Sequence, residues 1–447
     1  AVGSLLSTKA LGPAAASTCL LVTQGSAVLA SRSPAEELIP ASNLKLLTAT
    51  AALDKLGPDF VYTTVVRADA APVRGVLNGN LYLVGSGDPV LRTAPYVSSL
   101  PFSEPDYTSL EQLARQVVAA GVRVVTGSVV GDESFFDAER AVPTWKPVYT
   151  AEGDVGPLSA LDVNDGFALS GGYYKAAPSP ATAAAVQFAA LLAADGVKFM
   201  RPKPTPRRRS GPTVLIRSTV NLDAGTTGPT APPRPNPQPP PATAGITPPS
   251  AVPITAIDSP PLAKILETIL SASDDTGAEL VTKELGARFG GAGTTAAGIA
   301  VIRADLAARG LPVSQLQTAD GSGLDRSDRV TCQLIFDDLT QQRSGSPIVA
   351  GLPVAGKTGT LGARLKSPVT AGRILAKTGT LDDVSSLSGF VLARPGAPAA
   401  PGLAGNLVFS LIIDGLPSKT GDALSDDVAT ALATYPDVPP ASEVGPG

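Results

Sequence analysis

The stretch GPTAPPRPNPQPPPATAGITPPSAVP, residues 228–253, constrains the fold of this chain more than any other feature. Proline lacks a backbone donor and at this density favours extended polyproline conformation, so the stretch cannot supply a hydrophobic core. We interpret it as a loop or semi-rigid connector. With 447 residues, the chain is also longer than one typical core requires. The sequence therefore predicts two or more packed units.

The two ends of the chain share strand and helix patterns that the middle lacks. Residues 18–32 form two β-rich runs around a Gln-Gly-Ser turn, which predicts a hairpin. Near the other end, GRILAKTGTL, VSSLSGFVLA and NLVFSLIIDGL indicate strands before a last amphipathic helix. Between them, short strands and turns dominate, with one helical stretch near residues 181–196. We therefore expect one α/β domain, residues 1–70 and 256–447, interrupted by a large, mainly β inserted module at 71–255.

The chain contains no histidine. This excludes Ser-His-Asp and Cys-His mechanisms and the common histidine zinc sites, so a serine hydrolase would need a lysine as its base. The net charge of -4, without a block of like charges, gives no reason to expect a nucleic acid or an anionic membrane as partner. No metal or cofactor is expected.

Two cysteines, Cys19 and Cys332, are too few for a disulfide framework. They are compatible with one disulfide in an exported protein or with two buried thiols. The sequence shows no charged-then-apolar leader and no apolar run long enough to span a bilayer. Export therefore has to be argued from function.

The segment IPASNLKLLTATAALDKLG, residues 39–57, permits two interpretations of Ser42. Serine is a favoured helix N-cap, and the residues that follow have helical periodicity. Alternatively, Ser42 is a nucleophile, because Lys45 lies three residues later on the same helix face, where its amine can reach the hydroxyl. The segment alone does not decide between them.

The triplet Lys-Thr-Gly occurs at residues 357–359, 377–379 and 419–421. A cation at the end of an exposed strand can bind a substrate carboxylate, with backbone N–H groups beside it to polarise a carbonyl. Only Lys377 lies in a β-like run followed by a second β-like run. Lys357 lies in a glycine-rich loop, and Lys419 follows a proline and opens the last helix. The strand placement favours Lys377.

Two further polar segments need an interpretation. Ser273-Asp274-Asp275 is an exposed turn between helices or, together with the other two motifs, the group that passes a proton to a leaving amine. The order SxxK, SDx, KTG is much more specific than any one motif. The glycine run RFGGAGTTAAG lacks the lysine and the preceding strand of a P-loop, which favours an interhelical turn. Asp320-Gly-Ser-Gly is expected to turn the chain beside the site, with Ser322 not a nucleophile.

With these motifs in order, the chain resembles the D-alanyl-D-alanine carboxypeptidases of the low-molecular-mass class C penicillin-binding proteins. The resemblance covers residues 19–414 and rests on IPASNLKLLTA, LYLVGSGDPVL, DESFFDAERAVPTW, GPLSALDVNDG, SPPLAKILETILSASDD, ARFGGAG, DGSGLDRSDRV and ILAKTGTLDDVSSLSGF. It implies a transpeptidase-like fold, an antiparallel sheet flanked by helices, with a large insert between the first two motifs. It also places Lys377 at the family's KTG.

The resemblance implies a role for each motif residue. Ser42 would attack the penultimate D-alanine carbonyl, and Lys45, kept neutral by burial and by the nearby Lys377, would be its base. Ser273 would relay a proton to the departing D-alanine. The substrate-binding residues would be Asp275, Thr378, Gly379 and Thr380, with the substrate carboxylate on Lys377 and Thr378. The backbone N–H groups of Ser42 and Thr380 would form the oxyanion hole.

The chain departs from the family at Asp275, where relatives carry asparagine. A carboxylate cannot donate a hydrogen bond to a substrate carbonyl unless it is protonated, and it favours the charged form of Lys45. We therefore expect weak carboxypeptidase activity or a narrower substrate range, and slow acylation by penicillins.

The resemblance also implies the partners and the place of action. The expected substrates are peptidoglycan stem peptides ending in D-Ala-D-Ala, and β-lactams are the expected inhibitors. Endopeptidase activity on cross-bridges would extend this activity. The expected location is the periplasm or cell envelope of a bacterium. The alternatives are a β-lactamase or esterase on the same fold and a non-catalytic relative that binds peptidoglycan or a protein partner.

Overall fold

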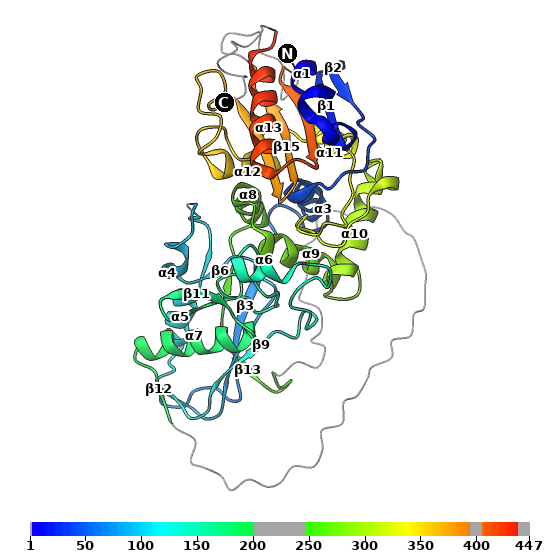
Figure 1. Cartoon of the computed structure of the whole chain (residues 1–447). Helices are drawn as coiled ribbons and strands as arrows, with labels where there is room; N and C mark the ends of the chain where they lie inside the picture. Colours follow the sequence, from blue (N-terminus) through cyan, green and yellow to red (C-terminus); the bar gives the residue numbers. More distant parts are fainter. Residues whose placement is uncertain (1, 103, 201–246, 394–404, 437–447) are drawn as a thin grey trace, which may run out of the picture.

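The structure is a computed structural model that describes residues 2–102, 104–200, 247–393 and 405–436 (Figure 1). Most of the predicted proline-rich connector, residues 228–246, lies outside the described residues. Its last two residues, Val252 and Pro253, begin a strand, β13 (Val252–Asp258). The expected connector therefore overlaps the start of this strand, because three prolines lie within the last six residues of the stretch.

Both ends of the chain form one five-stranded antiparallel sheet, in the order β14-β15-β16-β1-β2. The first strand pairs with the last, with Thr18 opposite Ile413. This confirms the prediction that terminal hairpins join a single sheet. The strands are β1 (Thr18–Gln24), β2 (Ala27–Arg32), β14 (Ile374–Leu381), β15 (Val384–Val391) and β16 (Leu407–Asp414).

Helices cover both faces of this sheet (Figure 1). Because β1 is covered on both sides, it is a continuous apolar run: Cys19 and Leu21 face one core, Leu20 and Val22 the other. One face carries the terminal helices α1 (Val2–Leu5), α2 (Thr8–Leu11) and α13 (Ser418–Thr434). The other carries α3 (Leu44–Leu56), α8 (Leu262–Ala272), α9 (Asp275–Phe289), α10 (Thr295–Ala308), α11 (Cys332–Gln341) and α12 (Pro347–Gly351).

A disulfide joins Cys19 of β1 to Cys332 at the start of α11. Both cysteines are fully buried. Of the two alternatives that the sequence left open, the structure shows the bonded one. The bond links the sheet to the helical layer that carries α3.

The inserted module has its own sheet and core. Its four-stranded sheet has the order β13-β3-β5-β9, and helices α5 (Leu110–Ala119) and α7 (Pro180–Ala194) pack on it. The helix expected near 181–196 is confirmed as α7. Helix α5 was not expected, although Leu110, Leu113, Ala114 and Val117 repeat with helical period and are buried. The sheet strands are β3 (Thr63–Ala68), β5 (Leu81–Val84) and β9 (Val129–Asp132).

The remaining elements of the insert are short. Two small sheets have the orders β12-β8-β4 and β6-β7, and β10 and β11 form a hairpin. Their bounds are β4 (Val76–Leu77), β6 (Leu91–Arg92), α4 (Ala94–Val97), β7 (Thr108–Ser109), β8 (Val124–Val125), α6 (Pro147–Glu152), β10 (Phe167–Ser170), β11 (Tyr173–Ala176) and β12 (Lys198–Phe199).

The insert begins and ends on paired strands. Thr63 at the start of β3 lies opposite Asp258 at the end of β13. We therefore propose boundaries at these two residues in place of the expected 71 and 255. The insert is thus a single module that begins and ends on two adjacent strands, and it lies between α3 and α8 in the chain.

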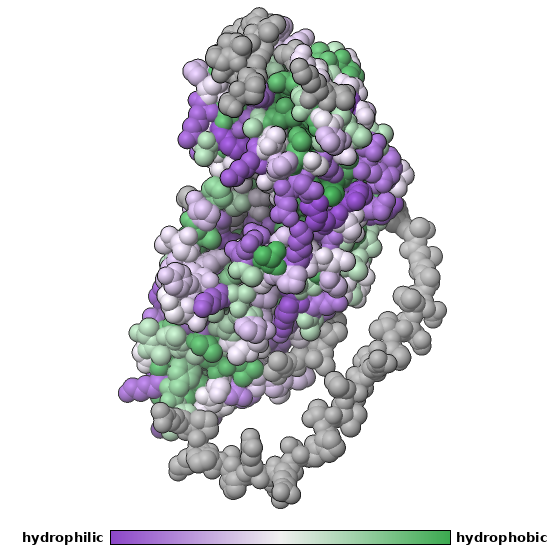
Figure 2. All heavy atoms as spheres, in the orientation of Figure 1, coloured by the Kyte–Doolittle hydropathy of each residue, from purple (hydrophilic) through white to green (hydrophobic). Residues whose placement is uncertain are grey.

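Helices α8 and α9 lie between the two halves of the molecule (Figure 1). Ion pairs at this boundary include buried Lys283 of α9 with Asp137 of the insert. Figure 2 shows hydrophilic residues gathered around the middle of the molecule on the face drawn. The candidate site lies in this middle region, because its residues come from α3, the α8–α9 turn and β14.

Candidate active site

Ser42 lies in a short 3-10 turn, Ala41–Asn43, that leads directly into α3. The residue that caps α3 is Asn43, and its side chain makes no capping hydrogen bond. The N-cap interpretation of Ser42 is therefore wrong: its Oγ lies 3.0 Å from Lys45 Nζ. The turn holds the hydroxyl at the helix N-terminus, where the helix dipole favours negative charge.

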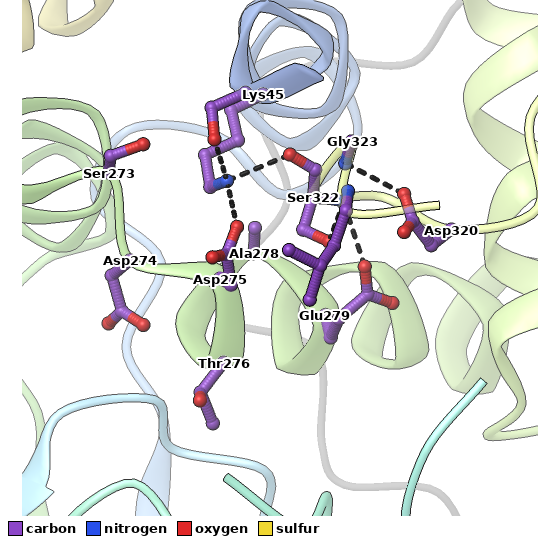
Figure 3. A network of polar contacts seen from close by, with 12 residues as sticks. Lys45, Ser273, Asp274, Asp275, Thr276, Ala278, Glu279, Asp320, Ser322 and Gly323 are labelled. Atoms are coloured by element: carbon purple, nitrogen blue, oxygen red, sulfur yellow. Dashed lines mark hydrogen bonds and ion pairs between the residues drawn. The ribbon is translucent and has the colours of Figure 1, made fainter. Parts of the chain in front are cut away.

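Lys45 is buried, and its side chain is 0% exposed. Its Nζ donates to Ser42 Oγ at 3.0 Å, to Asp275 Oδ1 at 2.5 Å and to the backbone carbonyl of Ser322 at 2.8 Å (Figure 3). Three acceptors match the three donors of an ammonium group. A neutral amine has only two N–H donors, so it would donate to two of these acceptors and direct its lone pair at the third.

The Ser273-Asp274-Asp275 segment forms the turn between α8 and α9. Ser273 caps α8 in the left-handed conformation, with φ of 62°. Asp274 caps α9 by accepting from the N–H of Gly277 at 2.8 Å. The strained serine and the tight turn place the side chains of Ser273 and Asp275 in the same site as Lys45. The segment is thus both an interhelical turn and part of the candidate site.

Lys377 lies on β14, the edge strand, which pairs with β15 in a hairpin as predicted. It is fully buried, and its Nζ donates to Ser273 Oγ at 2.7 Å and to the carbonyl of Thr378 at 2.8 Å. Burial, followed by the charge of Lys45, holds the pKa of Lys377 well below its usual range. Lys357 and Lys419 are exposed, in a turn and at the start of α13.

Gly379 lets β14 approach the nucleophile closely. A Cβ at this position would lie 2.9 Å from the backbone nitrogen of Ser42 and would collide with Ser386 Oγ. Only glycine fits there. Thr380 follows on the same strand and is exposed, with its hydroxyl 3.4 Å from Asp422. The structure thus brings Ser42, Lys45 and Ser273 together with the predicted KTG strand.

Asp275 is largely buried and pairs with Lys45. Burial raises the pKa of its carboxyl, and the charge of Lys45 acts in the opposite direction. The short ion pair shows that the carboxylate faces the amine of Lys45. This is the geometry in which a negative charge favours the ammonium form of the lysine.

Thr360 is a site neighbour that the sequence did not indicate. Its hydroxyl lies 2.6 Å from that of Thr378. The segment that carries it packs against the end of α8, because a Cβ at Gly359 would collide with Ser271. Thr360 directly follows the first Lys-Thr-Gly copy, residues 357–359, which we expected to be a glycine-rich loop away from the site.

The insert reaches the site through several side chains, two of which are buried. Arg92, buried, pairs with Asp274 at 3.1 Å, and Trp145 Nε1 donates to Asp320 at 2.8 Å. A cavity of about 170 Å³ lies beside the second motif, lined by residues of the insert that include Arg92 and Asp154 and by residues 272–276. Burial and the charge of Asp275 raise the pKa of Asp154.

The described residues contain neither a candidate metal site nor a membrane-spanning helix. In the parts of the chain that the structure describes, no group of three or more His, Cys, Asp or Glu side chains could hold a metal ion. Over the same residues, no helix combines the length and apolar character that crossing a membrane requires.

Comparisons with known proteins agree with the motifs. A model of the D-Ala-D-Ala carboxypeptidase 3 (S13) family of peptidases matches residues 1–194 and 242–435. The chain is 31% identical to a D-alanyl-D-alanine carboxypeptidase of Actinomadura sp. (strain R39), over 97% of this chain and 84% of that protein. It is 27% identical to a carboxypeptidase of Mycobacterium tuberculosis, over 80% of this chain and 69% of that protein.

Among solved structures, the chain is similar to penicillin-binding protein 4 of Haemophilus influenzae. The TM-score is 0.68 at 17% identity, and the match covers 94% of this chain and 95% of that one. The same protein in complex with a β-lactam gives a TM-score of 0.62. At this identity the likeness shows the fold, a penicillin-binding domain with a large insert.

Proposed function

The chain belongs to the S13 family of D-Ala-D-Ala carboxypeptidases, and on that premise we propose that Ser42 forms an acyl-enzyme with peptidoglycan stem peptides that end in D-Ala-D-Ala. It is a serine-type D-Ala-D-Ala carboxypeptidase of the penicillin-binding protein fold. The residues that carry the reaction, and the stem peptide as substrate, are our proposal.

Activation of the nucleophile starts from neutral Lys45. The Ser42 proton moves to its lone pair across 3.0 Å, while the two remaining N–H groups stay on Asp275 and the Ser322 carbonyl. The Ser42 oxygen then attacks the carbonyl of the penultimate D-alanine. The backbone N–H groups of Ser42 and Thr380 hold the oxyanion.

The departing D-alanine is held at the other side of the site. Lys377 and Thr378 bind its carboxylate, and Ser273 passes its proton to the leaving nitrogen as the C–N bond breaks. The proton that Lys45 took from Ser42 then restores the Ser273 hydroxyl. The 2.7 Å contact between Lys377 and Ser273 supports this pairing of roles, since an N–H donated to Ser273 Oγ stabilises that oxygen as it gives up its proton. Water then hydrolyses the Ser42 ester and releases the shortened peptide.

A β-lactam presents the same carbonyl and carboxylate in a strained ring. We propose that it acylates Ser42 and leaves slowly. The observation that carries the proposal is the placement of a buried amine, Lys45, within hydrogen-bond distance of Ser42 in a chain without histidine.

Intact mass measured at intervals after addition of a penicillin tests the proposal. A persistent adduct that Ser42→Ala abolishes is expected. A transient adduct would favour a β-lactamase or esterase, and the absence of any adduct would favour a binding protein. In parallel, release of D-alanine from a pentapeptide and cleavage of a cross-linked dimer measure carboxypeptidase and endopeptidase activity.

We propose that the protein acts outside the cytoplasm, in the periplasm or cell envelope of a bacterium. The Cys19–Cys332 disulfide supports this location, because disulfides persist in oxidising compartments. Alkylation of the natively expressed protein followed by mass measurement tests it. Full alkylation of both cysteines without prior reduction would contradict it.

A further inference from the structure

The buried glutamate Glu279 lies below the catalytic lysine on α9, one helical turn after Asp275 (Figure 3). Its Oε1 accepts the backbone N–H groups of Gly321 and Ser322, both at 2.8 Å. The Ser322 carbonyl in turn accepts from Lys45 Nζ. A chain of contacts therefore runs from the Glu279 carboxyl through the backbone of Ser322 to the amine of Lys45.

The loop that carries Ser322 is held in one conformation by its surroundings. A Cβ at Gly321 would collide with Thr282 Oγ1, and one at Gly323, with φ of +83°, would collide with the carbonyl of Ala41. Thr48, on the same helix as Lys45, donates to the carbonyl of Gly321 at 2.7 Å. The loop is thus fitted between α3 and α9, and Glu279 satisfies two of its amide donors.

The direction of the Lys45 lone pair depends on this loop. As a base, a neutral lysine amine has two N–H donors and one lone pair. Its two acceptors other than Ser42 are Asp275 Oδ1 and the Ser322 carbonyl. When both are in place, the lone pair can only face the hydroxyl of Ser42. Without the carbonyl, the amine can rotate away from the nucleophile.

We propose that Glu279 is a positioning residue for the acylation step. It holds the backbone N–H groups of Gly321 and Ser322 and so fixes the loop in which the Ser322 carbonyl orients the amine of Lys45 toward Ser42. A glutamate is costly at this position: it is fully buried, and its Oε2 has no hydrogen-bond partner among the described residues. Burial, followed by the charge of Asp320, raises the pKa of Glu279 to about 8. The neutral acid therefore predominates below that pH, and glutamine is its close mimic.

This inference rests on the proposed function, and saturation kinetics of acylation by a fluorescent penicillin test it. The first-order acylation constant, k2, reports the chemical step, and the dissociation constant, K, reports the preceding binding. Glu279→Met should lower k2 about 10- to 100-fold, the effect of a displaced catalytic group, and leave K within about twofold. Glu279→Gln keeps a carbonyl acceptor and should restore k2 to within about threefold of wild type.

Glu284→Met is the matched control. Glu284 is a fully buried glutamate on the same helix, paired with Arg288 and without a contact to the Ser322 loop. Its loss should lower the thermal midpoint without changing k2. Should E279M not fold, Thr48→Val removes another anchor of the same loop, and a lower k2 at unchanged K is again expected.

Three results would overturn the inference. The first is a wild-type k2 in E279M or in its substitute T48V. The second is a fall of k2 in E279Q as large as in E279M, and the third is a rise in K that accounts for the whole loss of acylation rate. Failure of the proposed function is a separate outcome, because the wild-type protein would then form no adduct.

Discussion

Replacement of Asp275 by asparagine should accelerate acylation of Ser42. The Asp275 carboxylate lies 2.5 Å from Lys45 Nζ and stabilises the ammonium form, which cannot accept the serine proton. Two unit charges about 4 Å apart interact by about 4 kcal/mol at an effective dielectric constant near 20. The Asp275 side chain is 13% exposed to the cleft, so we take half of this value. About 2 kcal/mol corresponds to roughly a 30-fold larger share of the neutral base.

Asparagine adds a second gain, because its amide can donate to the substrate carbonyl whereas an ionised carboxylate cannot. The assay is the second-order rate constant of acylation by a fluorescent penicillin at neutral pH, with release of D-alanine from a pentapeptide beside it. We expect increases of about 10- to 100-fold in both. Asp274→Asn is the matched control: it removes the neighbouring charge, keeps a good N-cap and does not touch Lys45.

An Asp275→Asn protein that is acylated no faster than wild type would refute the reasoning. Equal acceleration in Asp274→Asn would also refute it, because the effect would then come from the overall charge of the cleft rather than from the contact with Lys45.

Four further outcomes are expected. Lys377→Ala should slow acylation at least about 100-fold, whereas Lys419→Ala should leave it unchanged; an unaffected rate in K377A would show that another triplet binds the carboxylate. Thr360→Val removes the contact to the KTG threonine and should slow acylation by penicillin about 3- to 10-fold. Acylation by a thioester without a carboxylate should keep its rate, and an equal fall of both rates would contradict this. Cys332→Ser should lower the free energy of unfolding by about 2–5 kcal/mol, measured by denaturant titration, and an unchanged value would count against a native disulfide. The pKa of Glu279 is raised to about 8, so the folded state binds this proton more tightly than the unfolded state does. The stabilisation from this proton is therefore complete below about pH 4 and is lost as pH rises through 8. Glu279→Gln should flatten the resulting fall of the thermal midpoint between pH 5 and pH 9, and parallel profiles of variant and wild type would contradict this.

The parts of the fold that follow from local pattern were predictable from the sequence. Terminal hairpins, the helix after Ser42 and the KTG strand each have a strong period, and the three motifs occur in an order that few chains share. The strand placement of Lys377 was enough to separate it from Lys357 and Lys419. The pattern of α5 was also present but lies among short strands and turns, where a ten-residue helix is easily missed.

The contacts that surround the motifs were not predictable in this way. The hydrogen bond from Lys45 to the Ser322 carbonyl joins residues 277 positions apart. Because the acceptor is a backbone atom, the residue type at this position does not indicate the contact. Glu279 lies in a helix in which most of the other polar residues are also buried, so periodicity does not indicate its role. The strand start at Val252 was hidden because prolines on an outer strand resemble those of a connector.

The pairing of β3 with β13 makes the insert a removable attachment. The backbone N–H of Ser259 donates to the carbonyl of Tyr62 at 2.9 Å, so the chain leaves the catalytic half and re-enters it at nearly the same point. A deletion that splices these two positions through a short linker would keep the continuity from α3 to α8. The shortened enzyme would, however, leave Asp274 and Lys283 without their partners of opposite charge in the insert. The topology therefore permits removal of the module, but the unpaired charges would destabilise what remains.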